Sequence, residues 1–230
     1  MGELPAEFPC TVTNWEYIYD LCRDVADDVK RAEFEPDVVV ALARGGWFAG
    51  RCLCDFLGLD DLASLKIEHY VGTAQQGDEP EIRYPLADGA VEGKDVLVVD
   101  DIADTGQSLQ TAAECVAERD PASVRTATLQ LLDTSDHDPA FVGERLDEWT
   151  WVVYPWNFIE DMTELVGGVM EKSERDVHSV EDVRSLLRSY HDVKPTAFEI
   201  AQPDRLEEVM AEMVRREQAT ASGEGWRLVE

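Results

Sequence analysis

The stretch that decides the fold is Val96-Leu97-Val98-Val99-Asp100-Asp101-Ile102-Ala103-Asp104-Thr105-Gly106-Gln107-Ser108. Its first four residues are apolar and mostly β-branched, which predicts a strand buried on both faces. Two adjacent carboxylates follow where this strand should end, and a third precedes Thr105. Apolar residues then recur at helical spacing, at Leu109, Ala112, Ala113 and Val116. The stretch therefore predicts a strand, an acidic turn and a helix, in that order.

A strand, turn and helix in this order can bind a phosphate. Backbone N–H groups and the helix dipole both favour an anion at the start of the helix. Thr105 and Ser108 can add hydroxyl donors, and Gly106 lets the backbone approach the anion closely.

The paired carboxylates of Asp100 and Asp101 need a different explanation, because they repel a phosphate. Adjacent Asp side chains at a strand end suit vicinal sugar hydroxyls or a hydrated Mg²⁺, which prefers oxygen ligands. A phosphate, a sugar diol and Mg²⁺ together describe a phosphoribosyl compound. The alternative is a Rossmann-like turn with acidic helix caps. It explains one Asp as an N-cap, but not three carboxylates followed by Thr-Gly-x-Ser.

All thirteen positions resemble the signature of the type I phosphoribosyltransferases, enzymes that use 5-phosphoribosyl 1-pyrophosphate (PRPP). Only Ala103 is smaller than the branched residue usual at its position. The resemblance implies that Asp100 and Asp101 orient the ribose hydroxyls, partly through Mg²⁺. It also implies that the catalytic residue is Asp104, which takes or shares a proton of the base. The 5′-phosphate would be held by Asp104, Thr105, Gly106, Gln107 and Ser108.

A second anion loop is expected after an earlier strand, at residues 37–42. Arg44, Gly45 and Gly46 follow that strand and precede a helix from Trp47 to about Leu57. This loop resembles the family's pyrophosphate loop, whose backbone often has a cis peptide just before the Arg. The resemblance implies that Arg44 and the backbone of the two glycines bind the pyrophosphate of PRPP. The alternative for Arg44 is a surface ion pair.

A loop or hairpin is expected from Gly72 to Asp88, a segment rich in Gly, Gln, Asp and Pro with a short strand candidate at Ile82 and Tyr84. In the family, the loop at this place is a lid that closes over the site and excludes water. Lys66, at the end of the preceding strand, either reaches a phosphate or is solvated.

The residue expected to bind the base is Trp156, which follows Pro155 after a predicted strand at residues 149–154. This pair resembles the base-binding hood of archaeal and bacterial 6-oxopurine phosphoribosyltransferases, in which the Trp stacks on the purine. The alternative is a buried packing residue. Two positions depart from the family's pattern. Asn157 stands where relatives usually carry Glu, and residues 130–133 lack a Lys that contacts the purine's exocyclic oxygen.

The composition is strongly acidic, with 49 Asp and Glu against 20 Lys and Arg and a net charge of −29. This balance argues against nucleic acid and anionic membranes as partners. A hydrophobic fraction of 44% argues against a disordered acidic chain. Because salt screens self-repulsion, the composition suits a cytoplasm of very high salt, and we expect a halophilic source.

The five cysteines give no framework for disulfides or metal binding, because their number is odd and they are scattered. We interpret them as core or incidental thiols of a reducing cytosol. We find neither a signal peptide nor an apolar run long enough to span a bilayer, and we expect a cytoplasmic protein.

The predicted fold is an α/β domain over residues 1–170, with a mostly parallel sheet flanked by helices. Residues 1–12 are expected to be an irregular lead, and residues 133–148 an acidic loop. A small helical module should occupy residues 171–230. Its expected helix, short helix, helix and hairpin resemble a winged-helix outline. Its many Glu residues favour a capping or subunit-contact role over DNA binding.

The resulting prediction is a Mg²⁺-dependent phosphoribosyltransferase that joins a purine, with a 6-oxopurine expected, to PRPP and releases pyrophosphate. The resemblance also leads us to expect a homodimer or a higher homo-oligomer. The alternative is a regulator that retains the PRPP site as a sensor and has lost the chemistry. The tail and the absent Lys favour the alternative, whereas Asp104 and the net charge oppose it.

Overall fold

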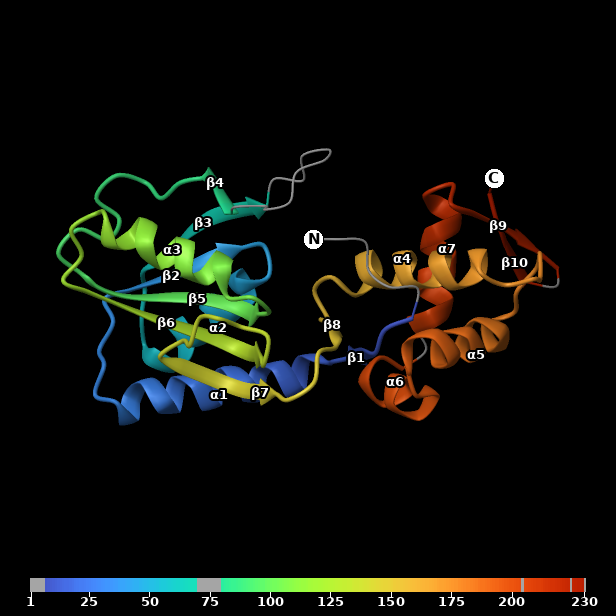
Figure 1. Ribbon diagram of the computed structural model, residues 1–230, viewed down its shortest axis with the longest axis horizontal. Helices are drawn as coiled ribbons and strands as arrows, with labels where there is room; N and C mark the ends of the chain where they lie inside the picture. The colour runs from blue at the N-terminus through green and yellow to red at the C-terminus, as the bar shows by residue number, and fades with distance from the viewer. Residues whose placement is uncertain (1–6, 70–79, 204, 224, 230) are drawn as a thin grey trace. The chain divides into compact units, whose positions relative to one another are not determined.

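The computed structural model describes residues 7–69, 80–203, 205–223 and 225–229 (Figure 1). The chain divides into two compact units. The first contains residues 16–149, and the second combines the residues up to Trp15 with those from Thr150 onward. This division differs from the boundary expected after residue 170, because residues 150–170 share an apolar core with the C-terminal helices.

The first unit is built on a six-stranded sheet with the strand order β4-β3-β2-β5-β6-β7. All neighbouring strands are parallel except β3 and β4, which form an antiparallel pair. This confirms the predicted α/β class with a mostly parallel sheet, and β4 confirms the short strand around Ile82. The strands are β2 (Val38–Ala43), β3 (Leu62–His69), β4 (Pro80–Tyr84), β5 (Asp95–Ala103), β6 (Ser123–Leu132) and β7 (Phe141–Leu146).

Helices cover both faces of this sheet (Figure 1). On one face, α3 (Gln107–Ala117) packs its apolar side chains against alternate residues of β2 and β5, including Val40 and Val98. On the other face, α2 (Gly46–Leu57) approaches β2 closely at Gly50. The helix α1 (Trp15–Arg31) packs beside α2 through the rings of Tyr19 and Phe56. Both faces of β2 and β5 are therefore buried, as their continuous apolar runs predicted.

The edge strand β7 lies within residues 133–148, which we expected to be a loop. The expectation of a loop was wrong for this part of the segment. The strand reads Phe-Val-Gly-Glu-Arg-Leu and lacks a clear apolar pattern. Its Glu144 carboxylate accepts hydrogen bonds from the Gln130 amide (2.9 Å) and the Tyr17 hydroxyl. Burial, with Glu144 adding to it, raises the pKa of Tyr17. Because the polar Glu144 is paired within the fold, the sequence of β7 lacks the apolar pattern by which a strand is predicted.

In its described residues, the second unit contains four helices and two small sheets. The strand β1 (Cys10–Val12) pairs in parallel with β8 (Trp151–Val153), which corrects the expectation of an irregular lead. Its helices are α4 (Phe158–Glu171), α5 (Val180–His191), α6 (Pro195–Ala201) and α7 (Arg205–Arg215). They precede the antiparallel hairpin of β9 (Ala219–Ser222) and β10 (Gly225–Leu228). The expected helix, short helix, helix and hairpin are all present.

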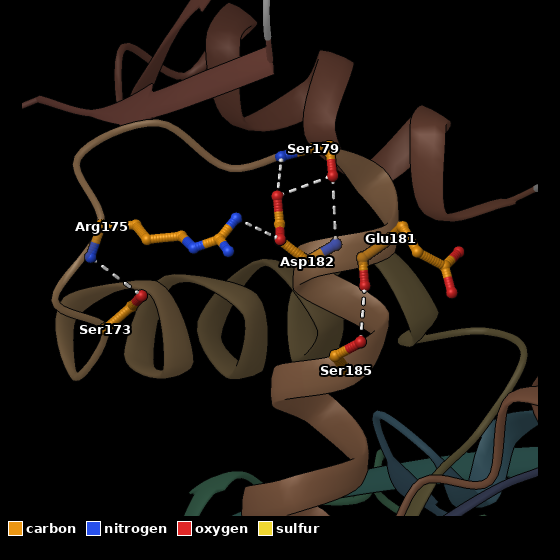
Figure 2. A network of polar contacts seen from close by, with 6 residues as sticks. All are labelled: Ser173, Arg175, Ser179, Glu181, Asp182 and Ser185. Carbon is orange, nitrogen blue, oxygen red and sulfur yellow. Dashed lines mark hydrogen bonds and ion pairs between the residues drawn. The ribbon is translucent and has the colours of Figure 1, made fainter.

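A capping box starts α5 (Figure 2). The Ser179 hydroxyl oxygen accepts a hydrogen bond from the backbone N–H of Asp182 at 3.2 Å. In return, the Asp182 carboxylate accepts one from the backbone N–H of Ser179 at 3.0 Å, and Arg175 donates to the same carboxylate at 2.6 Å. Because these bonds satisfy N–H groups that the first turn leaves unpaired, they fix where the helix begins.

No helix in the described parts of the chain combines the length and the apolar character that crossing a membrane requires.

Candidate active site

Two loops of the first unit lie side by side where β2 and β5 end. The two strands are parallel neighbours, with Ala41 opposite Val99. Both strands therefore end at the same edge of the sheet. The loop after β2 carries Arg44 and Gly45 into α2, and the loop after β5 carries residues 104–106 into α3. The structure thus brings together the two loops that the sequence predicted as anion sites, at the strand ends where ligands of open α/β sheets bind.

Glycine at positions 45 and 46 allows the two loops to approach this closely. A Cβ atom at Gly45 would lie 1.7 Å from Oδ2 of Asp101. At Gly46 it would lie 2.7 Å from the Val99 carbonyl oxygen and 3.1 Å from Oδ1 of Asp100. The first loop therefore packs its bare backbone against the acidic end of β5. The peptide bond between Ala43 and Arg44 is cis, as the resemblance implied.

The carboxylates of Asp100 and Asp101 form a strained electrostatic pair. Burial raises the pKa of Asp100 well above its ordinary value, and the neighbouring Asp101 charge and a shared hydrogen bond add to the shift. One oxygen of each carboxylate accepts a backbone N–H at 3.0 Å, from Asp101 and Ile102 respectively. A divalent cation would relieve the repulsion between two such carboxylates.

The two carboxylates also suit Mg²⁺ better than a metal ion that takes all its ligands from the protein. Among the described residues, no three His, Cys, Asp or Glu side chains gather into a metal-binding group. Mg²⁺ is commonly held by one or two carboxylates, and waters and substrate phosphates complete its shell. Asp100 and Asp101 supply that number of ligands.

The turn from Asp104 to Gly106 leads directly into α3. Gly106 has a φ of +76°, a left-handed conformation that favours glycine. The Thr105 hydroxyl accepts a hydrogen bond from the Gln107 N–H at 3.4 Å. Gln107 and Ser108 form the first turn of the helix, where backbone N–H groups and the helix dipole favour an anion. The turn therefore has the predicted local geometry, and its binding of a phosphate stays a prediction.

The structure adds a segment that sequence reasoning missed, residues 134–137, which we name the brace. The Thr134 hydroxyl lies 2.8 Å from Oδ1 and 3.1 Å from the carbonyl oxygen of Asp104. The Asp136 N–H donates to the Thr105 carbonyl at 3.2 Å. A Cβ at Gly106 would lie 2.5 Å from Oγ of Ser135, so the brace also packs against that glycine. The available signal was topological, since the brace follows β6, the parallel neighbour of β5.

Other residues singled out in the sequence have local partners. Lys66 forms an ion pair with Glu68, and its Nζ lies 5.9 Å from the centre of the Tyr84 ring. Gln130, in the region where relatives tend to carry Lys, instead donates to Tyr17 (3.0 Å) and Glu144 (2.9 Å). Within the predicted lid, residues 72–79 lie outside the described residues.

Trp156 belongs to the second unit. Its ring is parallel to that of Tyr154, with centroids 4.7 Å apart, and tilted against Trp15 at 5.8 Å. The next residue, Asn157, accepts the Tyr154 N–H at 3.0 Å and stands at the start of α4. Trp156 is thus half-buried in an aromatic cluster, and its stacking on a base stays a prediction.

Comparison with known proteins places these loops in a family. The model of the phosphoribosyl transferase domain matches residues 11–158. A hypoxanthine-guanine phosphoribosyltransferase of Rattus norvegicus is 36% identical over 76 residues, which is 32% of this chain and 35% of that protein. A xanthine-guanine phosphoribosyltransferase of Nitratidesulfovibrio vulgaris is 27% identical over 121 residues, 52% of this chain and 68% of that one.

A solved structure, a purine phosphoribosyltransferase from Pyrococcus horikoshii, matches with a TM-score of 0.57 and 26% identity, over 64% of this chain and 93% of its own. The mammalian relatives are matched over only about a third of their length. The family model, in contrast, covers more than half of the chain and includes both anion loops. On this ground, the chain belongs to the phosphoribosyl transferase domain family.

Proposed function

We propose that the protein is a purine phosphoribosyltransferase that joins a 6-oxopurine base to PRPP, requires Mg²⁺ and releases pyrophosphate. The observation that carries this proposal is the packing of Gly45 and Gly46 against the carboxylates at the end of β5. PRPP has a pyrophosphate, a ribose diol and a 5′-phosphate, and the first unit offers a group suited to each. The purine and xanthine-guanine enzymes among the similar proteins support a purine as the acceptor.

In this reaction, a nitrogen of the base forms a bond to C1 of the ribose while the bond from C1 to pyrophosphate breaks. Positive charge develops on the ribose, so catalysis depends on positioning and electrostatics. Arg44 and the backbone N–H groups of the first loop bind the leaving pyrophosphate. Thr105 to Ser108 hold the 5′-phosphate. The proton lost by the base moves to the carboxylate of Asp104, or is shared with it.

Asp100 and Asp101 have two roles in the proposal. They orient the ribose hydroxyls by accepting hydrogen bonds from them, and they hold Mg²⁺. When bound, the ion neutralises part of the negative charge that collects on the pyrophosphate.

Trp156 is proposed to stack on the purine ring. An aromatic residue provides a large apolar face that tolerates different purines. Because Asn157 and Gln130 depart from the usual pattern, the choice among xanthine, hypoxanthine and guanine rests on direct assay.

The experiment is Mg²⁺- and PRPP-dependent release of pyrophosphate with a panel of purine and pyrimidine bases. It is run in molar KCl, because the acidic composition supports adaptation to high salt. We expect release with one or a few 6-oxopurines. Replacing Asp104 with Asn should lower turnover by about 10²- to 10⁴-fold, the usual contribution of a general base. PRPP binding should be nearly unchanged.

Two outcomes would contradict the proposal in different ways. If Asp104→Asn retains full turnover, the assignment of the base is wrong. If the wild type releases no pyrophosphate with any base yet binds PRPP, the protein is a sensor of PRPP rather than a transferase.

A further inference from the structure

The side chain of Thr134 is the closest described polar partner of the Asp104 carboxylate. Its Oγ1 lies 2.8 Å from Oδ1 and 3.1 Å from the carbonyl oxygen of the same residue. Both Asp104 oxygens are acceptors only, so the hydroxyl is the donor in each contact. One hydroxyl proton thus ties the carboxylate of Asp104 to its own backbone.

Thr134 is itself held in place by the rest of the brace. The Ser135 N–H donates to the Leu132 carbonyl at 3.0 Å, and the Ser135 hydroxyl donates to the His137 carbonyl at 2.8 Å. Nε2 of His137 lies 3.3 Å from the hydroxyl of Thr126, a buried residue of β6. These contacts fix the chain next to Thr134 on the sheet, while the Thr134 side chain itself is exposed and meets Asp104.

A carboxylate that must receive a proton needs this kind of support. Asp104 is half-buried in the turn after β5, so its carboxylate remains partly open to solvent. A hydrogen bond to one oxygen fixes the plane of the carboxylate and directs the other oxygen toward a defined point. A misplacement of about 1 Å in a reacting group can lower the rate about 100-fold.

We propose that Thr134 is a positioning residue for Asp104: its hydroxyl binds Oδ1, so that the second carboxylate oxygen faces the N–H proton of the purine. This inference rests on the proposed function. Thr134 itself touches neither substrate nor the reacting atoms.

The test compares Thr134→Val and Thr134→Ser with the wild type. Valine keeps the shape and removes the donor, whereas serine keeps the donor. We expect Thr134→Val to lower kcat about 10- to 100-fold. The KM for PRPP should change less than about twofold, because no phosphate contact is lost. Thr134→Ser should restore kcat to within about threefold of the wild type.

Two controls separate positioning from folding. Asp138→Asn alters an exposed ion pair with Arg145 beside the brace, and it should leave kcat and the KM for PRPP unchanged. In an Asp104→Asn background, Thr134→Val should cause little further loss, because both changes remove the same function. A positioning role predicts this non-additivity, and a general weakening of the fold does not.

The outcomes separate this inference from the proposed function. An inactive wild type would overturn both. An active wild type with a normal Thr134→Val variant would overturn this inference alone. It would also be overturned if serine failed to rescue the valine variant, or if the losses of Asp104→Asn and Thr134→Val multiplied.

Discussion

At the scale of single residues, Gly45 and Gly46 have different reasons to lack a side chain. A Cβ at Gly45 would meet Oδ2 of Asp101, the movable end of a side chain, at 1.7 Å. A Cβ at Gly46 would meet the backbone oxygen of Val99 at 2.7 Å, inside a strand that cannot shift easily. The absence of a side chain at Gly45 therefore leaves room for the Asp101 carboxylate. Its absence at Gly46 allows α2 to pack closely on the sheet.

Gly45→Ala should consequently damage function more than stability. The methyl group displaces the Asp101 carboxylate, so we expect the KM for PRPP to rise at least about tenfold, with a melting temperature within about 3 °C of the wild type. Gly46→Ala should instead destabilise the protein by about 1–3 kcal/mol through overpacking. Steady-state kinetics and thermal unfolding measure both effects.

Gly168→Ala provides the matched control, because a Cβ there meets nothing within 4 Å and the residue lies inside α4. It should leave kinetics unchanged and stabilise the helix by up to about 1 kcal/mol. Equal effects of Gly45→Ala and Gly46→Ala on the melting temperature would refute the distinction.

Much of the candidate site was predictable from the sequence because it lies within two short continuous motifs. Asp100 to Ser108 and Arg44 to Gly46 each follow a buried strand, and parallel strands end at the same edge. Thr134 could not be predicted, since its contact with Asp104 depends on where the chain turns after β6. The contact between Cys22 and Cys52 could not be predicted from the sequence either, because it depends on how α1 packs beside α2.

That cysteine pair also has chemical consequences. The hydrogen bond between the two thiols lowers the pKa of Cys52 and raises the pKa of Cys22, and burial adds to the rise at Cys22. Two cysteines that looked incidental in the sequence therefore form one contact between α1 and α2.

At the scale of elements, the capping box of α5 makes a testable contribution to stability. Ser179→Ala removes the side-chain oxygen that accepts the Asp182 N–H. We expect a loss of about 0.5–2 kcal/mol, or about 1–8 °C in melting temperature for a chain of this size. Thermal unfolding followed by circular dichroism measures the change.

Ser185→Ala is the control, and Figure 2 shows both serines. The Ser185 hydroxyl is exposed and donates to the Glu181 carbonyl within the same helix, a bond that adds little to helix stability. This variant should keep or slightly raise the melting temperature. If both variants lost the same amount, the cap would have no special role.

The elements that escaped prediction are short strands whose support comes from distant partners. β1 has three residues and pairs with β8 far along the chain, so no local pattern could reveal it. β7 lies at the edge of the sheet, where Glu144 is satisfied by Gln130 and Tyr17. The long apolar runs of β2 and β5 were predictable because burial on both faces determines their composition directly.

At the scale of the whole molecule, the net charge of −29 should make stability depend on salt. The Debye length falls from about 10 Å at 0.1 M salt to about 3 Å at 1 M, which screens repulsion among the carboxylates. We expect the melting temperature to rise by at least about 5 °C between 0.1 and 1 M KCl. Most of the total rise in melting temperature between 0.1 and 3 M KCl should occur below 1 M.

The shape of this dependence distinguishes screening from the general exclusion of salt from protein surfaces, which keeps growing with concentration. Measurements continue to 3 M KCl for that reason. A melting temperature that stays constant throughout, or climbs steadily to 3 M, contradicts the electrostatic explanation.

The parallel pairing of β1 with β8 has a consequence for synthesis on the ribosome. About 140 residues separate the two strands along the chain. At translation rates of about 5–20 residues per second, β1 emerges roughly 7–28 s before its partner exists. The second unit therefore cannot fold in the order in which it is synthesised. Its first strand, β1, stays unpaired while the whole first unit is made.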